Sequence, residues 1–133
     1  MYFRKIPISI QFEAACAAVT VHNSRNVWKI LRGYGYPFWI IFHDRHLKKY
    51  LSFTQTQLLE HLKQHPDLCK NIILDCGDKR WSPDTYIEGE GRRYAVGYFD
   101  IKNIPNRSEV RFFDNIEEAV TDYVLFSLKM PRE

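Results

Sequence analysis

The chain has 133 residues, of which 45% are hydrophobic and 15% aromatic, and its net charge is +3 at neutral pH. This length is typical of a single domain, and the hydrophobic content is too high for a disordered segment. We therefore expect one domain over residues 1–133. No apolar run is long enough to span a membrane, and we expect a cytoplasmic location.

The charge is unevenly distributed along the chain. Residues 1–65 contain nine Lys and Arg residues against three Asp and Glu residues, whereas residues 66–133 contain ten against thirteen. This distribution predicts two electrostatically distinct surfaces, and such surfaces steer partners rather than determine the fold.

The N-terminal part is expected to form two helices. Residues 10–21 begin with an alanine-rich run that favours helix, although their β-branched end favours strand, so both assignments stay open for residues 10–22. Residues 25–32 form the second predicted helix, because Asn23 and Ser24 supply an N-cap and Gly33 supplies a C-terminal cap.

Residues 38–42 form an unbroken run of β-branched and aromatic side chains. A strand with one face in water alternates apolar and polar residues, so this run predicts a strand buried on both faces. We expect residues 37–43 to be the central strand of a largely antiparallel sheet, with residues 47–53 pairing back against it.

A middle helix is predicted over residues 55–65. Thr54 and Gln57 have the spacing of a capping box, and Phe53 and Leu58 have the spacing of a hydrophobic staple. Pro66 removes a backbone donor and is expected to end the helix.

The second half of the chain is expected to add most of the sheet and a last helix. Residues 71–76, 85–87, 92–101 and 109–113 are predicted strands, and residues 88–91 are a predicted hairpin turn. Asn115 and Glu118 form a second capping box, which begins a helix over residues 116–129. Leu125 and Phe126 lie outside its apolar stripe and belong either to the core or to an interface.

Together these elements predict an α+β fold. Its sheet is expected to be covered by the N-terminal helices, the middle helix and the C-terminal helix.

Two groups of side chains have structural as well as chemical interpretations. His61 and His65 are four residues apart on one helix, a spacing found in metal sites, but the sequence places no third ligand beside them. Cys16, Cys69 and Cys76 are expected to be buried, reduced thiols rather than nucleophiles.

One spacing is similar to a magnesium-dependent nuclease pattern, in which Pro-Asp is followed by Glu-x-Lys. Here Pro83 and Asp84 are followed by Glu88 or Glu90 and then by Arg92. Arginine is a poor proton acceptor and does not replace the lysine that activates water. A magnesium-dependent nuclease is therefore a lesser alternative.

The segment 25–49 alternates basic and aromatic residues, a composition that can hold a nucleic-acid backbone and stack bases. Its members are Arg25, Trp28, Lys29, Arg32, Tyr34, Tyr36, Arg45, Lys48 and Lys49. An ordinary solvated surface explains the same residues, and no helix-turn-helix or zinc pattern accompanies them. Nucleic-acid binding is kept as an alternative function.

The stretch 78–90 combines carboxylates with aromatic residues. Its candidate binding residues are Asp78, Trp81, Asp84, Tyr86, Glu88 and Glu90. Aromatic residues ringed by carboxylates suit a protein partner with a basic surface. The competing interpretation is a loop whose Trp81 and Tyr86 fold back onto the core.

A compact, aromatic-rich α+β domain without an active-site motif resembles the bacterial immunity proteins of contact-dependent inhibition and related polymorphic-toxin systems. The resemblance covers the whole chain in size and class and is carried by no diagnostic motif. It implies a non-catalytic protein without a cofactor that binds and neutralises a cognate toxin domain, often a nuclease. The acidic surface expected of such an inhibitor is confined to residues 78–90.

Overall fold

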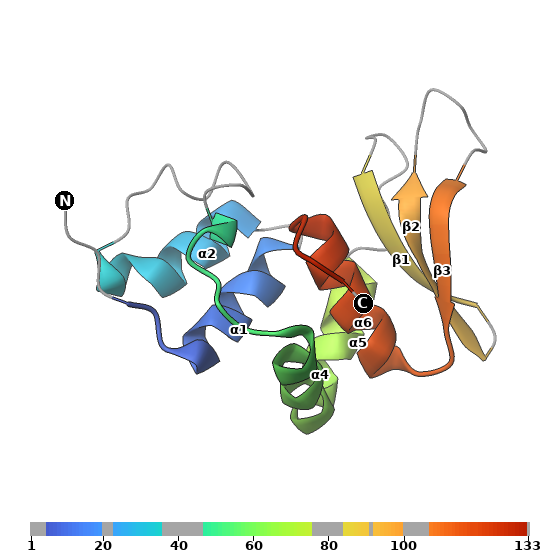
Figure 1. Cartoon of the computed structure of the whole chain (residues 1–133), viewed down its shortest axis with the longest axis horizontal. Coiled ribbons are helices and arrows are strands. Elements are labelled where there is room, and N and C mark those ends of the chain that lie inside the picture. The colour runs from blue at the N-terminus through green and yellow to red at the C-terminus, as the bar shows by residue number, and fades with distance from the viewer. Residues whose placement is uncertain are drawn as a thin grey trace.

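The computed structural model describes residues 5–19, 23–35, 47–75, 84–90, 92–99 and 107–132. In this part of the chain the structure has an α+β fold, which confirms the predicted class (Figure 1). The elements in chain order are α1 (Ile8–Ala18), α2 (Asn23–Leu31), the 3-10 helix η1 (Arg32–Tyr34), α4 (Gln55–Gln64), α5 (Pro66–Asp75), β1 (Asp84–Glu90), β2 (Arg93–Phe99), β3 (Arg107–Phe113) and α6 (Ile116–Ser127). The predicted central strand 37–43 lies outside the described residues.

The three described strands form an antiparallel sheet in the order β1-β2-β3. Ile87 of β1 pairs with Val96 of β2, which pairs with Arg111 of β3. Ile87 and Val96 are buried in the core, and α6 packs against the sheet, so this cross-strand row lies on the inner face (Figure 1). Because side chains alternate along a strand, the residues between them lie on the outer face.

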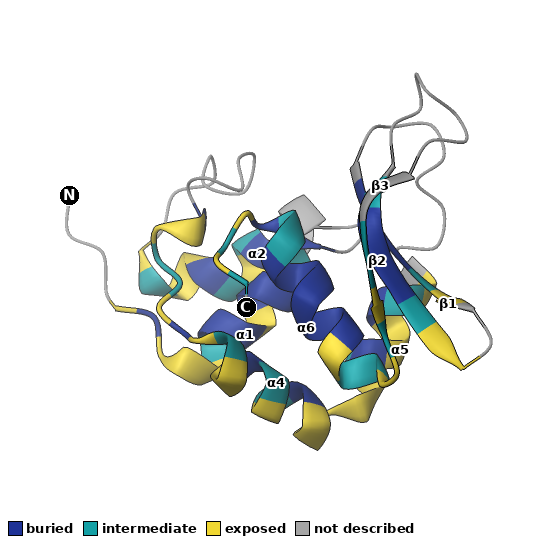
Figure 2. Ribbon diagram, turned by 45° about the vertical axis from the view of Figure 1, so that its right-hand side comes forward, coloured by how far each residue is buried: buried dark blue, intermediate teal, exposed yellow. Residues whose placement is uncertain are grey.

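Helix α6 occupies the centre of the molecule, between the other helices and the sheet (Figure 2). Asn115 caps it by accepting from the Glu118 backbone N–H at 2.8 Å, and Glu117 and Glu118 place negative charge at its positive end. All seven residues from 119 to 125 are buried. Leu125 therefore belongs to the core.

Burial of α6 on several sides brings a carboxylate inside, and two arginines compensate it. Asp122 is 2% exposed, and its two carboxylate oxygens accept from Arg111 of β3 at 2.7 Å and Arg132 of the C-terminal tail at 3.0 Å. Burial raises the pKa of the Asp122 carboxyl, while both guanidiniums act in the opposite direction. The carboxylate thus joins the sheet and the tail to the central helix.

Helix α4 begins where the sequence predicts. The Thr54 side chain accepts from the Gln57 backbone N–H at 3.2 Å, and the Gln57 side chain accepts from the Thr54 backbone N–H at 2.8 Å. This reciprocal pair is the predicted capping box. The predicted end is also confirmed, since α4 stops at Gln64, two residues before Pro66.

Two predicted strands are wrong. Residues 71–76 were expected to be a strand, but residues 66–75 form helix α5, which Pro66 begins. A short apolar run fits either a strand or a buried helix, and here tertiary packing places Cys69 and Ile72 on the buried side of a helix. Residues 47–53 form a helical turn followed by an extended segment instead of pairing as a strand.

A buried glutamine on α1 joins three segments of the chain. Gln11 is 2% exposed, and its amide nitrogen donates to the Ile6 carbonyl at 2.9 Å and to Ser52 Oγ at 3.1 Å. Its amide oxygen accepts from the Ser52 backbone N–H at 2.6 Å. The side chain therefore fixes the entry to α1 and the segment that leads into α4.

We predict that Gln11→Ala lowers the free energy of unfolding by about 2–3 kcal/mol, because it leaves the Ser52 N–H and the Ile6 carbonyl without these partners. Urea denaturation measures the change. The matched control is Gln64→Ala, at an exposed position on α4, for which we expect a change within about 0.5 kcal/mol. Equal losses in the two variants would contradict the role given to Gln11.

Candidate protein-binding surface

The outer face of the sheet carries a second cross-strand row. Glu88 of β1 pairs with Ala95 of β2, and Ala95 pairs with Phe112 of β3. Ala95 is small and buried, so the surface of the middle strand lies lower than that of the edge strands, where Glu88 and Phe112 have longer side chains. We call Glu88, Arg93, Ala95 and Phe112 the outer sheet face.

Phe112 is the most exposed aromatic residue in the described part of the chain, with 54% of its surface accessible. The guanidinium of Arg93, from the neighbouring strand, lies 4.6 Å from the centre of its ring. An arginine at this distance attracts the ring face and restricts the ring's motion. The pair therefore presents a large apolar group in a fixed position next to a positive charge.

The inner face explains why this pair is held firmly. Thr85 Oγ1 lies 2.6 Å from Ser127 Oγ, and Arg111 is bonded to Asp122, so both edge strands have polar links to α6. The Arg111 guanidinium also lies 5.7 Å from the ring centre of Phe113, the neighbour of Phe112. The backbone that carries Phe112 is thus supported from behind.

The structure places the six predicted binding residues differently from one another. Asp78 and Trp81 lie outside the described residues, and Asp84 and Glu90, of which only the backbone is described, form the two ends of β1.

The remaining two residues of the predicted set lie within β1. Tyr86 is 8% exposed and pairs with Gly97, whereas Glu88 is half-buried on the outer sheet face. Of the predicted set, Glu88 is the residue that lies in one row with Phe112.

Residues 88–90 belong to strand β1 and not to the predicted hairpin turn. Asp84 and Glu88 are four positions apart on this strand, which separates their backbones by about 13 Å. Arg92 follows the end of the strand that lies away from Asp84. A magnesium ion bound by two carboxylates needs ligand oxygens about 2 Å from the metal. The extended strand therefore holds the backbones of Asp84 and Glu88, the two acids of the nuclease-like pattern, far apart.

Sequence reasoning missed Phe112 and Arg93. The residues 109–113 were recognised as a strand, but exposure depends on which face α6 covers, and the alternation of Arg111, Phe112 and Phe113 does not settle this. A usable signal was the unbroken pair Phe112-Phe113, since neighbouring strand residues point to opposite faces.

His61 of α4 and His65, which follows the helix, stack instead of converging on a metal. The His61 ring lies between Phe12, at 4.6 Å, and His65, at 4.2 Å between ring centres. His65 Nδ1 donates to the His61 carbonyl at 2.8 Å. In the described ranges no group of three or more His, Cys, Asp or Glu side chains is placed to hold a metal ion.

Two cysteines are free and buried among the described residues. Burial raises the pKa of Cys16 to about 12 and that of Cys69 to about 11. A thiol that stays protonated at neutral pH is a poor nucleophile. Cys76 lies outside the described part of the chain.

The chain has no match among protein-family models, curated proteins or solved structures. None of the described helices is long and apolar enough to cross a membrane.

We predict that His61 makes stability depend on pH. Burial, then the neighbouring His65, lower the pKa of His61 below its ordinary value of 6.5. The unfolded chain therefore takes up this proton at a higher pH than the folded chain, and the free energy of unfolding falls as pH drops below about 6.5.

Urea denaturation at about pH 7.5 and about pH 5.5 measures this loss. His61→Phe keeps a ring between Phe12 and His65 and removes the titrating group, so its loss of stability over the same pH range should be smaller. An unchanged loss in this variant would show that other groups cause the dependence.

Proposed function

We propose that this chain is a non-catalytic binding protein that holds and neutralises a cognate toxin domain, as bacterial immunity proteins do. The observation that supports it most is the exposed Phe112 ring stacked with Arg93 on a sheet face that α6 does not cover. We further propose that the protein acts in the cytoplasm, where buried thiols such as Cys16 and Cys69 stay reduced.

The chemistry of the outer sheet face favours a protein partner. Aromatic and arginine side chains are enriched among the residues that dominate protein–protein binding energies, especially where the ring fills a pocket of the partner. A ring that is already fixed loses little conformational entropy on binding. Phe112 with Arg93 meets both conditions.

The charges beside Phe112 add a requirement on the partner. Arg93 is exposed on the middle strand, two residues before Ala95, and half-buried Glu88 lies across Ala95 from the ring. A partner that fits therefore offers an apolar pocket with a basic group toward Glu88 and an acidic or carbonyl group toward Arg93. Such complementary charges increase association rates and restrict the choice of partner.

The test uses the protein domain encoded by the gene immediately upstream, because an immunity protein is expected beside its toxin. We expect one-to-one association in biolayer interferometry. Phe112→Ser should weaken the complex at least tenfold, since the ring supplies much of the apolar contact. Because Phe112 is 54% exposed and its described ring contact is with Arg93, the variant should stay folded, with a loss of about 1 kcal/mol in its free energy of unfolding.

The matched control is Leu74→Ser, on α5, where the side chain is 78% exposed. We expect it to leave the affinity unchanged. A neighbouring gene without a toxin domain, or equal affinities of the Phe112→Ser and unaltered proteins, would contradict the proposal.

Charge reversal separates association from final affinity. Glu88→Lys should slow association with a basic toxin domain by about threefold to tenfold at low salt, with a smaller effect at high salt. Stopped-flow mixing measures the rate. Kinetics identical to those of the unaltered protein at low salt would exclude Glu88 from the contact.

A further inference from the structure

A second surface lies at the end of the molecule away from the sheet. It combines α2, η1 and the turn at residues 47–50, and it exposes Lys29, Arg32, Lys48 and Lys49. In the described ranges 5–19, 23–35 and 47–54 the only acidic residue is Glu13. We call Trp28 and these four cations the basic face.

The turn that carries Lys48 and Lys49 is attached to the chain that follows α6. Lys48 Nζ donates to the Lys129 carbonyl at 3.0 Å, which attaches the turn to the segment that follows α6. Lys129, whose carbonyl accepts this bond, is itself an exposed cation and has a left-handed backbone with φ of 57°. Positive charge therefore gathers near the C-terminal end of α6, where the helix dipole favours cations.

Arg32 gives the basic face a flat surface. Its guanidinium lies 5.4 Å from the centre of the Trp28 ring. A guanidinium plane supported by an indole can stack with an unpaired base. A set of lysines without such a plane offers charge alone.

We propose that the basic face binds a single strand of nucleic acid, with the lysines at phosphates and Arg32 stacked on a base. Unpaired strands fit better than a duplex, because stacking needs a base whose face is free. An acidic protein surface would satisfy the lysines equally well but would give no role to the Arg32 plane.

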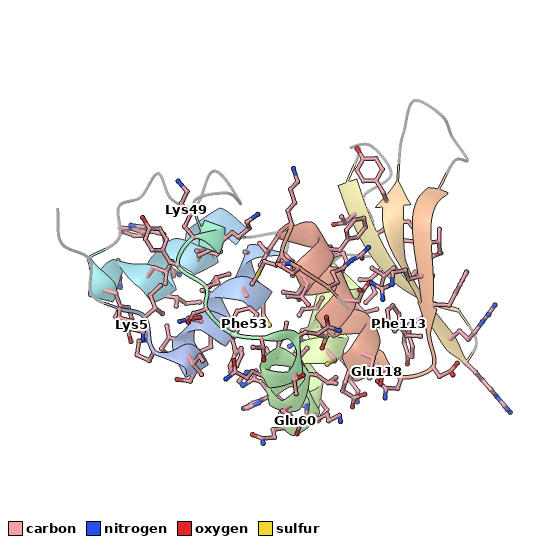
Figure 3. The ribbon with its side chains drawn as sticks, in the orientation of Figure 1. Lys5, Lys49, Phe53, Glu60, Phe113 and Glu118 are labelled. Atoms are coloured by element: carbon pink, nitrogen blue, oxygen red, sulfur yellow. The ribbon has the colours of Figure 1, made fainter. Side chains whose placement is uncertain are left out.

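This surface is separate from the outer sheet face. In Figure 3 Lys49 lies at the upper edge of the molecule beyond the helices, while Phe113, next to Phe112 in sequence, lies on the sheet at the other end. Glu60 and Glu118 lie at the lower edge of the same view. Binding of nucleic acid at the basic face therefore goes beyond the proposed toxin binding and does not depend on it.

Fluorescence anisotropy with a labelled oligothymidylate of about 12 nucleotides tests the proposal. Three phosphate contacts, from Lys29, Lys48 and Lys49, predict that affinity falls about 20-fold between about 50 mM and about 200 mM salt. Lys29→Glu combined with Lys49→Glu should weaken binding at least about tenfold at the lower salt. Lys48 is left unchanged because of its bond to the Lys129 carbonyl.

The control is Lys63→Glu combined with Lys70→Glu, which changes the total charge equally at exposed positions on α4 and α5. We expect its affinity to stay within about threefold of the unaltered protein. An equal loss in both double variants would show attraction by total charge alone and would overturn the proposal.

Arg32→Lys distinguishes a base from other anions, because it keeps the charge and removes the plane. It should weaken binding to oligothymidylate by about fivefold and leave binding to an abasic strand of the same length unchanged. Equally tight binding of polyglutamate would identify an acidic protein as the ligand instead. Polyglutamate binding, an equal effect on both strands, or no binding at the lower salt would each overturn the proposal.

Discussion

The fold depends on burying α6 on several sides at once. A helix with seven consecutive buried residues cannot keep its polar groups in water, so each needs a partner inside the protein. Thr121 donates to the Glu117 carbonyl of its own helix at 2.7 Å, and Asp122 accepts from two arginines. Those arginines come from β3 and from the tail, so compensating a single carboxylate also positions the sheet against the helix. Removing one partner of such a buried group commonly costs several kcal/mol.

Because α6 covers one face of the sheet, that face stabilises the fold, and we propose that the other face binds a partner. The inner face of the three strands supplies Ile87, Val96 and Arg111 to α6. The outer face does not pack against α6, and it carries Phe112 under the Arg93 guanidinium. Exposed Phe112 contributes little to the core, and we propose that it contacts a protein partner.

Local signals in the sequence predicted the elements whose ends are defined by side-chain hydrogen bonds. The capping box at Thr54 and the N-cap at Asn115 correctly located the starts of α4 and α6, because capping chemistry acts over three residues. The strand predicted at residues 71–76 failed, since a short apolar run has no period of its own and tertiary contacts decided for helix α5. The candidate site was predicted only in part. Glu88 was named from composition, but Phe112 joins it through strand register, which a single sequence does not specify.

The most direct measurement is amide hydrogen exchange of the protein alone and in complex with the proposed partner, the protein domain encoded by the neighbouring gene. If the outer sheet face is the contact, exchange slows in the edge strands β1 and β3 and is unchanged in α1 and α4. Slower exchange confined to the helices, with β1 and β3 exchanging as they do in the free protein, would contradict the assignment of this face to partner binding.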